Sequence, residues 1–104
     1  MTDPAPIIAN DLVEGRAKLT NKRGLHARAS AKFAALVQSY DAKVEVTSCN
    51  NVCASKVVGD SIMELLLLGS ACGEDLCLSA RGPQAQEAVD ALVELIENKF
   101  GEEA

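Results

Sequence analysis

The sequence predicts an α+β fold, an open-faced β-sandwich in which three helices cover one face of a four-stranded antiparallel sheet. Four short segments alternate apolar and polar residues, which is the pattern of a strand with one buried and one solvated face. Three further segments carry apolar residues at helical spacing, and they interleave with the strands in the order β-α-β-β-α-β-α. Because every strand has a polar face, the helices are expected only on the other side of the sheet.

The first two predicted elements are a strand over residues 12–20 and a helix from Ala27 to about Ser39. Odd positions of the strand are small or apolar and even positions are polar, so its two faces differ in polarity. Apolar residues recur at helical spacing in the segment that follows, at Phe33, Leu36, Val37 and Tyr40.

A hairpin is predicted next, with strands over residues 42–48 and 52–58. Val44 and Val46 alternate with polar residues in the first of these strands, whereas the second has apolar residues on both faces. The pair Asn50-Asn51 indicates the turn between them. A bulge or a wider loop is expected at this point.

The remaining predicted elements are a short helix, a strand and a long helix. Ser61 and Glu64 have the spacing of a capping box, so the short helix is expected to begin at Ser61 and to end at Gly69. Alternation over residues 76–81 predicts the fourth strand. The last helix begins at Gly82-Pro83, and its apolar stripe consists of Ala85, Ala88, Val89, Leu92, Leu95, Ile96 and Phe100.

Length and composition indicate a single domain over residues 12–104, preceded by a flexible tail over residues 1–11. The chain has 104 residues, of which 48% are hydrophobic and 24% charged, values that are ordinary for one globular domain. Residues 1–11 lack the basic and apolar regions of a signal peptide, and the longest apolar runs are too short to cross a bilayer. We therefore expect a cytoplasmic protein that does not insert into membranes.

Charge and aromatic content argue against nucleic acid as a partner. The net charge is −5 and the isoelectric point is about 4.8, whereas binding to nucleic acid depends on basic side chains that neutralise phosphates. The aromatic residues that could stack on bases are few, namely Phe33, Tyr40 and Phe100.

His26 is the only histidine of the chain, and it lies where a turn becomes a helix. Gly24 permits the backbone angles of that turn, which places His26 at or next to the helix N-cap. The unpaired N–H groups and positive dipole end of a helix N-terminus favour an anion, and Arg28 adds a cation. A histidine in this setting is suited to accepting and returning a phosphoryl group. The structural alternative is a helix cap or a surface residue.

Two motifs resemble those of a known family. The stretch Gly24-Leu25-His26-Ala27-Arg28, followed by an alanine-rich amphipathic helix, resembles the active centre of HPr, the histidine-containing phosphocarrier protein of bacterial phosphotransferase systems. Residues 60–69, which include Ser61-Ile62-Met63, resemble the segment that opens the family's second helix. The resemblance runs from about residue 12 to residue 100 and implies the same open-faced sandwich. The last helix with its acidic tail looks more like the nitrogen-related branch than the sugar-transport branch.

The resemblance implies that His26 accepts a phosphoryl group on Nδ1 from phosphorylated Enzyme I and passes it to an Enzyme IIA-type protein. Arg28 would steady the phosphate, and the backbone N–H groups of Ala27 and Arg28 would complete the anion site. Such a protein is a stoichiometric carrier and not an enzyme, needs no cofactor and is expected to be a monomer. Ala29 departs from the family, which usually has proline there, and this affects the rigidity of the first helical turn.

Ser61 has two interpretations. Its spacing to Glu64 indicates an ordinary helix N-cap. In many HPr proteins, however, the serine at this place is phosphorylated by an HPr serine kinase/phosphorylase, and the added charge weakens docking of the phosphoryl donor. The alternative function is therefore a regulatory protein that acts through phosphorylated Ser61 and partner binding, with His26 vestigial.

The short helix over residues 62–68 is apolar on nearly all sides, which usually indicates burial. If Ile62, Met63 and Leu66 instead remain partly exposed, they form an apolar docking patch, and methionine adapts to several partners. We expect partial exposure, and the resemblance implies that Enzyme I and Enzyme IIA-type proteins share this patch.

Four cysteines raise the alternatives of a metal-binding module or of disulfides, namely Cys49, Cys53, Cys72 and Cys77. Their spacing is looser than the close pairs of common zinc sites, so no metal site is predicted. Reduced thiols are expected, because nothing in the sequence indicates an oxidising compartment. The last residues, 101–104, are interpreted as a solvated acidic tail.

Overall fold

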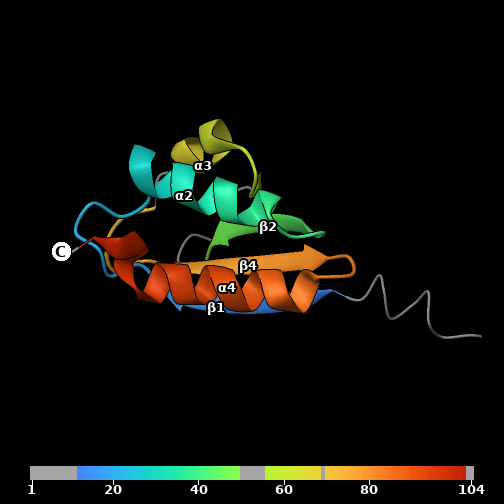
Figure 1. Ribbon diagram of the computed structural model, residues 1–104. Helices are drawn as coiled ribbons and strands as arrows, with labels where there is room; N and C mark the ends of the chain where they lie inside the picture. Colours follow the sequence, from blue (N-terminus) through green and yellow to red (C-terminus); the bar gives the residue numbers. More distant parts are fainter. Residues whose placement is uncertain (1–11, 50–55, 69, 103–104) are drawn as a thin grey trace, which may run out of the picture.

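The structure, a computed structural model, describes residues 12–49, 56–68 and 70–102. The elements follow the predicted order (Figure 1). They are β1 (Val13–Lys18), α2 (Ala27–Gln38), β2 (Lys43–Ser48), β3 (Val57–Val58), α3 (Ile62–Leu68), β4 (Asp75–Arg81), α4 (Ala85–Glu97) and a short 3-10 helix, η1 (Lys99–Gly101). The predicted tail over residues 1–11 and the predicted turn at 50–51 lie outside the described residues.

The four strands form one antiparallel sheet in the order β1-β4-β2-β3. The strand β4 pairs with β1 from Val13↔Ala80 to Lys18↔Asp75, and it also pairs with all of β2. The predicted third strand over 52–58 is confirmed in its described part, where Val57 and Val58 pair with β2, although Lys56 lies outside the strand. Residues 52–55 of that prediction lie outside the described residues.

The helices cover one face of the sheet, and the other face is open to solvent (Figure 1). Alternate strand residues are buried beneath the helices, including Ala17, Val44, Val46, Leu76 and Leu78. Helix residues complete the core, including Phe33, Val37, Leu65, Leu92 and Ile96. The predicted α+β class and its one-sided layer of helices are therefore confirmed, because alternation in a strand reports which face is buried.

The last helix ends earlier than the sequence predicts, before Phe100. Helix α4 ends at Glu97, and Lys99 and Phe100 then adopt positive φ angles of 58° and 56°. This left-handed backbone is costly for residues with a Cβ, but Phe100 is 1% exposed and Lys32 Nζ donates a hydrogen bond to its carbonyl at 2.6 Å. The 3-10 helix η1 consequently lies beside the turn that leads into α2 (Figure 1).

The predicted capping box at α3 is half formed. Ser61 Oγ accepts a hydrogen bond from the backbone N–H of Glu64 at 3.2 Å, as an N-cap does. The Glu64 carboxylate does not return to Ser61, however, and instead accepts from the backbone N–H of Val58 at 2.9 Å. This contact ties α3 to β3.

The prediction of reduced thiols is wrong for two of the four cysteines. Cys49 and Cys77 form a disulfide with a Cα–Cα distance of 5.5 Å. Pairing of β2 with β4 places Thr47 opposite Cys77, and Cys49, two residues after Thr47, therefore reaches Cys77 diagonally on the same face. Cys72 is the exposed free cysteine of the described residues, and Cys53 lies outside them. No cluster of three metal-ligating side chains occurs in the described ranges.

Candidate functional site

The turn before α2 is held by close backbone contact with the segment that precedes β4. Gly24 has a φ of +62°, and a Cβ at this position would lie 2.5 Å from the carbonyl oxygen of Ser70. Next to it, the backbone N–H of Leu25 donates to the same Ser70 carbonyl at 2.9 Å. Both the positive φ angle of Gly24 and its close approach to the Ser70 carbonyl require glycine at this position. The turn therefore places His26 at a defined position.

His26 is the N-cap of α2, as its position after the turn predicts. Its backbone is extended, with φ −84° and ψ −175°, and its Nδ1 accepts a hydrogen bond from the backbone N–H of Arg28 at 3.3 Å. The ring is therefore attached to the helix terminus through Nδ1, which is the atom that the resemblance implicates in phosphoryl transfer.

Glu102 binds the other ring nitrogen of His26, and its side chain is only 13% exposed. The prediction of a solvated tail is therefore wrong at this residue. Asn21, which is fully buried, donates through Nδ2 to Glu102 Oε1 at 3.0 Å and to the Gly24 carbonyl at 2.8 Å. The contact is possible because the positive φ angles at residues 99 and 100 turn the chain back to the site.

These two contacts assign the ring nitrogens of neutral His26. A carboxylate can only accept, so Nε2 carries the proton and donates it to Glu102. A backbone N–H can only donate, so Nδ1 presents its lone pair toward Arg28 N. The neighbours of the imidazole thus hold the tautomer in which Nδ1 is the nucleophilic atom.

The Glu102 carboxyl is ionised more readily than usual. Partial burial opposes its ionisation and acts to raise the pKa. Hydrogen bonds from Asn21 and His26 act in the opposite direction, as do the positive charges of the His26 ring when it is protonated and of Arg28, so the pKa lies below its ordinary value. Glu102 is therefore a carboxylate at neutral pH.

The start of α2 has the properties of an anion site. The first N–H groups of a helix, here those of Ala27 and Arg28, have no acceptor within the helix. No acidic residue lies in the first turn of α2, and the exposed Arg28 side chain adds positive charge. Ala29, at the position where the family usually has proline, is fully buried and continues the helix.

An exposed apolar surface lies on α3, which packs beside α2 (Figure 1). Ile62 is 43% exposed, Met63 70% and Leu66 39%, so these residues have the partial exposure that was expected from the sequence. Leu67, which the sequence did not single out, is 81% exposed. Ser61 is half-buried at the start of the same helix. We call Ile62, Met63, Leu66 and Leu67 the α3 patch.

Sequence reasoning missed Glu102 and Asn21 as members of the site. Asn21 lies three residues before the motif that begins at Gly24, and its amide has no distinguishing pattern. Phe100 in the apolar stripe of the last helix indicates that the chain stays attached to the core there, yet the direction taken afterwards depends on backbone angles that no residue pattern signals.

The family comparison matches nearly the whole chain. The model described as "PTS HPr component phosphorylation site" covers residues 13–98. In the part of the chain that the structure describes, no helix has the length and apolar character needed to cross a membrane.

Individual relatives agree with that match. The phosphocarrier protein HPr of Pseudomonas aeruginosa is 44% identical over 84 residues, which are 81% of this chain and 90% of that protein. The phosphocarrier protein NPr of Escherichia coli is 35% identical over 91 residues, 88% of this chain and 98% of that protein. The crystal structure of HPr from Thermoanaerobacter tengcongensis superimposes with a TM-score of 0.80 at 40% identity and covers 88% of this chain and 99% of its own. The chain therefore belongs to the HPr family, the phosphocarrier proteins of the bacterial phosphotransferase system.

Proposed function

We propose that His26 carries the phosphoryl group, which it accepts on Nδ1 from phosphorylated Enzyme I and passes to a histidine of an Enzyme IIA-type protein. The observation that supports this role is the pair of ring contacts, in which Glu102 binds Nε2 and the Arg28 N–H points at Nδ1. A nucleophile needs a lone pair, and this tautomer keeps one on Nδ1, from which the 3.3 Å hydrogen bond of the Arg28 N–H is released when phosphorus approaches.

The transfer step is a displacement at phosphorus. The Nδ1 lone pair of His26 forms the new P–N bond, the P–N bond to the donor histidine breaks, and its electron pair returns to the donor ring. The Nε2 proton remains hydrogen-bonded to Glu102, whose negative charge offsets the positive charge on the attacking imidazole. The N–H groups of Ala27 and Arg28 and the Arg28 guanidinium then receive the phosphoryl oxygens. Transfer to the acceptor is the same step in reverse.

The α3 patch is the proposed docking surface for both partners, through Ile62, Met63 and Leu66. Exposed apolar side chains beside a helix that carries the reacting group suit transient association with alternating partners. The protein acts as a stoichiometric monomeric carrier in the cytoplasm, with residues 12–104 as its domain, and has no catalytic turnover of its own and no cofactor.

Ser61 is the basis of the alternative, a regulatory role through an HPr serine kinase/phosphorylase. Its hydroxyl accepts from the N–H of Glu64, which accounts for the residue as a helix cap. The relatives named as phosphocarriers favour the carrier role over this alternative. Phosphorylation of Ser61 would place negative charge beside Ile62 and Met63 and weaken docking of the donor.

Incubation with labelled phosphoenolpyruvate and a bacterial Enzyme I tests the carrier role. Intact protein should take up acid-labile label in a one-to-one ratio, and His26→Ala should take up none. Ser61→Ala is the matched control, since it leaves the ring untouched and should label like the intact protein. Folded intact protein that stays unlabelled with an active donor would refute the proposal.

A further inference from the structure

The disulfide between Cys49 and Cys77 lies on the open face of the sheet. Cys77 is the register partner of Thr47 on β2 and of Arg16 on β1. Both cysteines are only partly buried, because no helix covers this side (Figure 1). The bond is therefore within reach of small molecules in solution.

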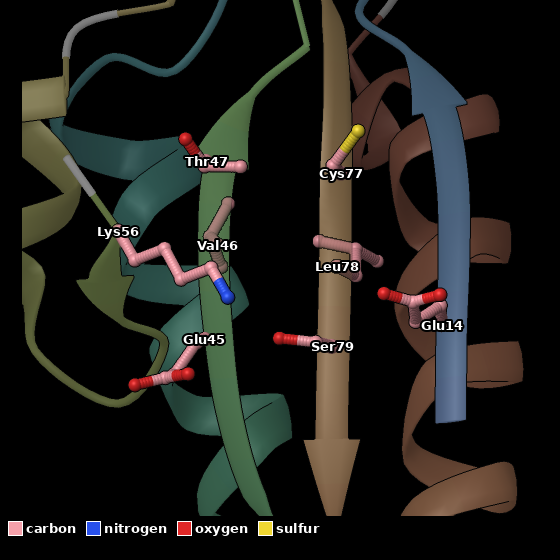
Figure 2. A pocket seen from close by; sticks show the side chains of 8 residues that line it. All are labelled: Glu14, Glu45, Val46, Thr47, Lys56, Cys77, Leu78 and Ser79. Atoms are coloured by element: carbon pink, nitrogen blue, oxygen red, sulfur yellow. The ribbon is translucent and has the colours of Figure 1, made fainter. Parts of the chain in front are cut away.

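A shallow pocket of about 100 Å³ opens next to this bond. Cys77 lines it together with Glu14, Thr47, Lys56 and Ser79, and Figure 2 shows the Cys77 side chain at one end of the pocket. In that view the sulfur of Cys77 points away from Lys56 and Ser79, so a thiol would reach it from that end of the pocket.

The charges around the pocket suit a small zwitterionic thiol. Lys56 contributes an ammonium group, and Glu14 and Glu45 contribute carboxylates. Arg16, opposite Cys77 across the β1–β4 pair, is held in an ion pair with Asp75 at 2.9 Å. A small thiol that carries both a carboxylate and an ammonium group therefore meets an opposite charge for each in the pocket.

The disulfide also borders the segment that supports the active-site turn. We call residues 70–75 the support segment. On one side it is bonded to the end of β2, since Cys49 N–H donates to the Asp75 carbonyl at 2.9 Å. On the other side Leu19 N–H, directly after β1, donates to the Glu74 carbonyl at 2.8 Å. In the turn before His26, Leu25 N–H donates to the Ser70 carbonyl at 2.9 Å.

We propose that Cys49 and Cys77 are a reversible thiol–disulfide pair, exchanged by thiols of the glutathione class through the pocket on the open face, whose oxidised state holds the support segment and the turn before His26. The exchange chemistry is independent of the carrier role, and only its consequence for His26 rests on the proposed function. Disulfides of cytosolic proteins are usually transient or redox-sensing.

The exchange occurs in two displacements. The thiolate of one glutathione attacks Sγ of Cys77, a mixed disulfide forms, and Cys49 leaves as a thiolate that takes a proton from water. A second glutathione thiolate attacks the mixed disulfide on its glutathione sulfur, which releases oxidised glutathione and leaves Cys77 as a thiolate. Two electrons pass from two glutathione molecules to the protein, and oxidised glutathione reverses both steps.

The test uses the full chain with Cys53→Ser and Cys72→Ser, so that only the pair remains. The protein is equilibrated in graded mixtures of reduced and oxidised glutathione, quenched in acid and analysed by mass spectrometry. The pair should open in excess reduced glutathione and close in excess oxidised glutathione, with the mixed disulfide on Cys77. A pair that never closes, a pair that never opens, or a mixed disulfide on Cys49 would each overturn the proposal.

Amide hydrogen exchange of the same protein tests the coupling to the turn. Reduction should speed exchange at Leu25 about tenfold, because its acceptor lies on the support segment, and leave Leu92 in α4 unchanged as an internal control. Equal rates at Leu25 in both states would refute the coupling. Phosphoryl uptake by the two states is then compared. If neither the oxidised nor the reduced protein takes up phosphoryl groups, the proposed carrier role is contradicted. The thiol–disulfide proposal is unaffected by that result, because the glutathione and hydrogen-exchange measurements do not depend on phosphoryl uptake.

Discussion

The carboxylate of Glu102 and the Nε2 atom of His26 are hydrogen-bond partners although the two residues are 76 positions apart in the chain. Asn21 holds the same carboxylate from the other side at 3.0 Å. Glu102 is thus part of the histidine site, and it binds the ring through Nε2 and not through Nδ1, the proposed phosphorylation atom.

Removing the Glu102 side chain is expected to slow phosphoryl uptake by His26. Glu102→Ala takes away the acceptor for Nε2–H and should lower the rate about tenfold, because the ring loses its fixed tautomer. Glu102→Gln should retain more activity, since its amide oxygen can still accept that proton. The measurement is the rate of labelling by Enzyme I, with exposed Glu97→Ala as control. A Glu102→Ala protein as fast as Glu97→Ala would contradict the role.

The lowered pKa of Glu102 predicts a pH dependence of stability. A carboxyl whose pKa is lower in the folded than in the unfolded state stabilises the protein at pH values above its unfolded-state pKa, here about 4.5. This contribution is lost as the pH falls through the folded-state pKa. The intact protein should therefore lose more stability than Glu102→Gln between pH 5 and strongly acid solution. Urea unfolding of both proteins over that range measures the difference. Parallel curves would show that the ionised carboxylate adds no stability.

Gly24 and Gly73 form a matched pair for testing the active-site turn. Both have positive φ, at +62° and +94°, but only a Cβ on Gly24 meets backbone, whereas one on Gly73 meets nothing within 4 Å. Gly73→Ala should cost about 1 kcal/mol of unfolding free energy through its backbone angle. Gly24→Ala should cost about 3 kcal/mol because a steric clash is added. Equal losses in denaturant unfolding would mean that the close approach to Ser70 does not matter.

A substitution in the α3 patch is expected to weaken docking of Enzyme I without lowering the stability of the fold. Met63, which is 70% exposed, can become Glu with a change of unfolding free energy within about 0.5 kcal/mol. The KM of Enzyme I for the Met63→Glu protein should rise about tenfold, because a charge now enters an apolar contact. Leu12→Glu is the control, as Leu12 is also an exposed apolar residue, 43% exposed, but lies before β1. If both variants have the same KM, docking on α3 is refuted.

The sheet and its covered face could be predicted from sequence because alternation directly reports which side of a strand is buried. Val44 and Val46 point into the core, as do Leu76 and Leu78. The starts of α2 and α3 were also predictable, since Gly24 before His26 and Ser61 before Glu64 are local signals whose physical causes act within a few residues. The last helix starts later than predicted, at Ala85 and not at Gly82-Pro83.

The contacts that were missed depend on tertiary structure. Glu102 reaches His26 because two non-glycine residues, Lys99 and Phe100, adopt left-handed backbone angles, which residue identity does not indicate. Cys49 meets Cys77 because of the register between β2 and β4, and cysteine spacing alone does not determine strand register.

The sheet order has a consequence for synthesis on the ribosome. The strand β1 emerges first, but its partner β4 is the last strand of the sheet to be translated. Until β4 follows, the nascent chain holds β1 with its backbone unpaired and its apolar face without the cover of α4. Closing so long a loop is slow compared with local folding, so the histidine site assembles only once the far end of the domain has left the exit tunnel.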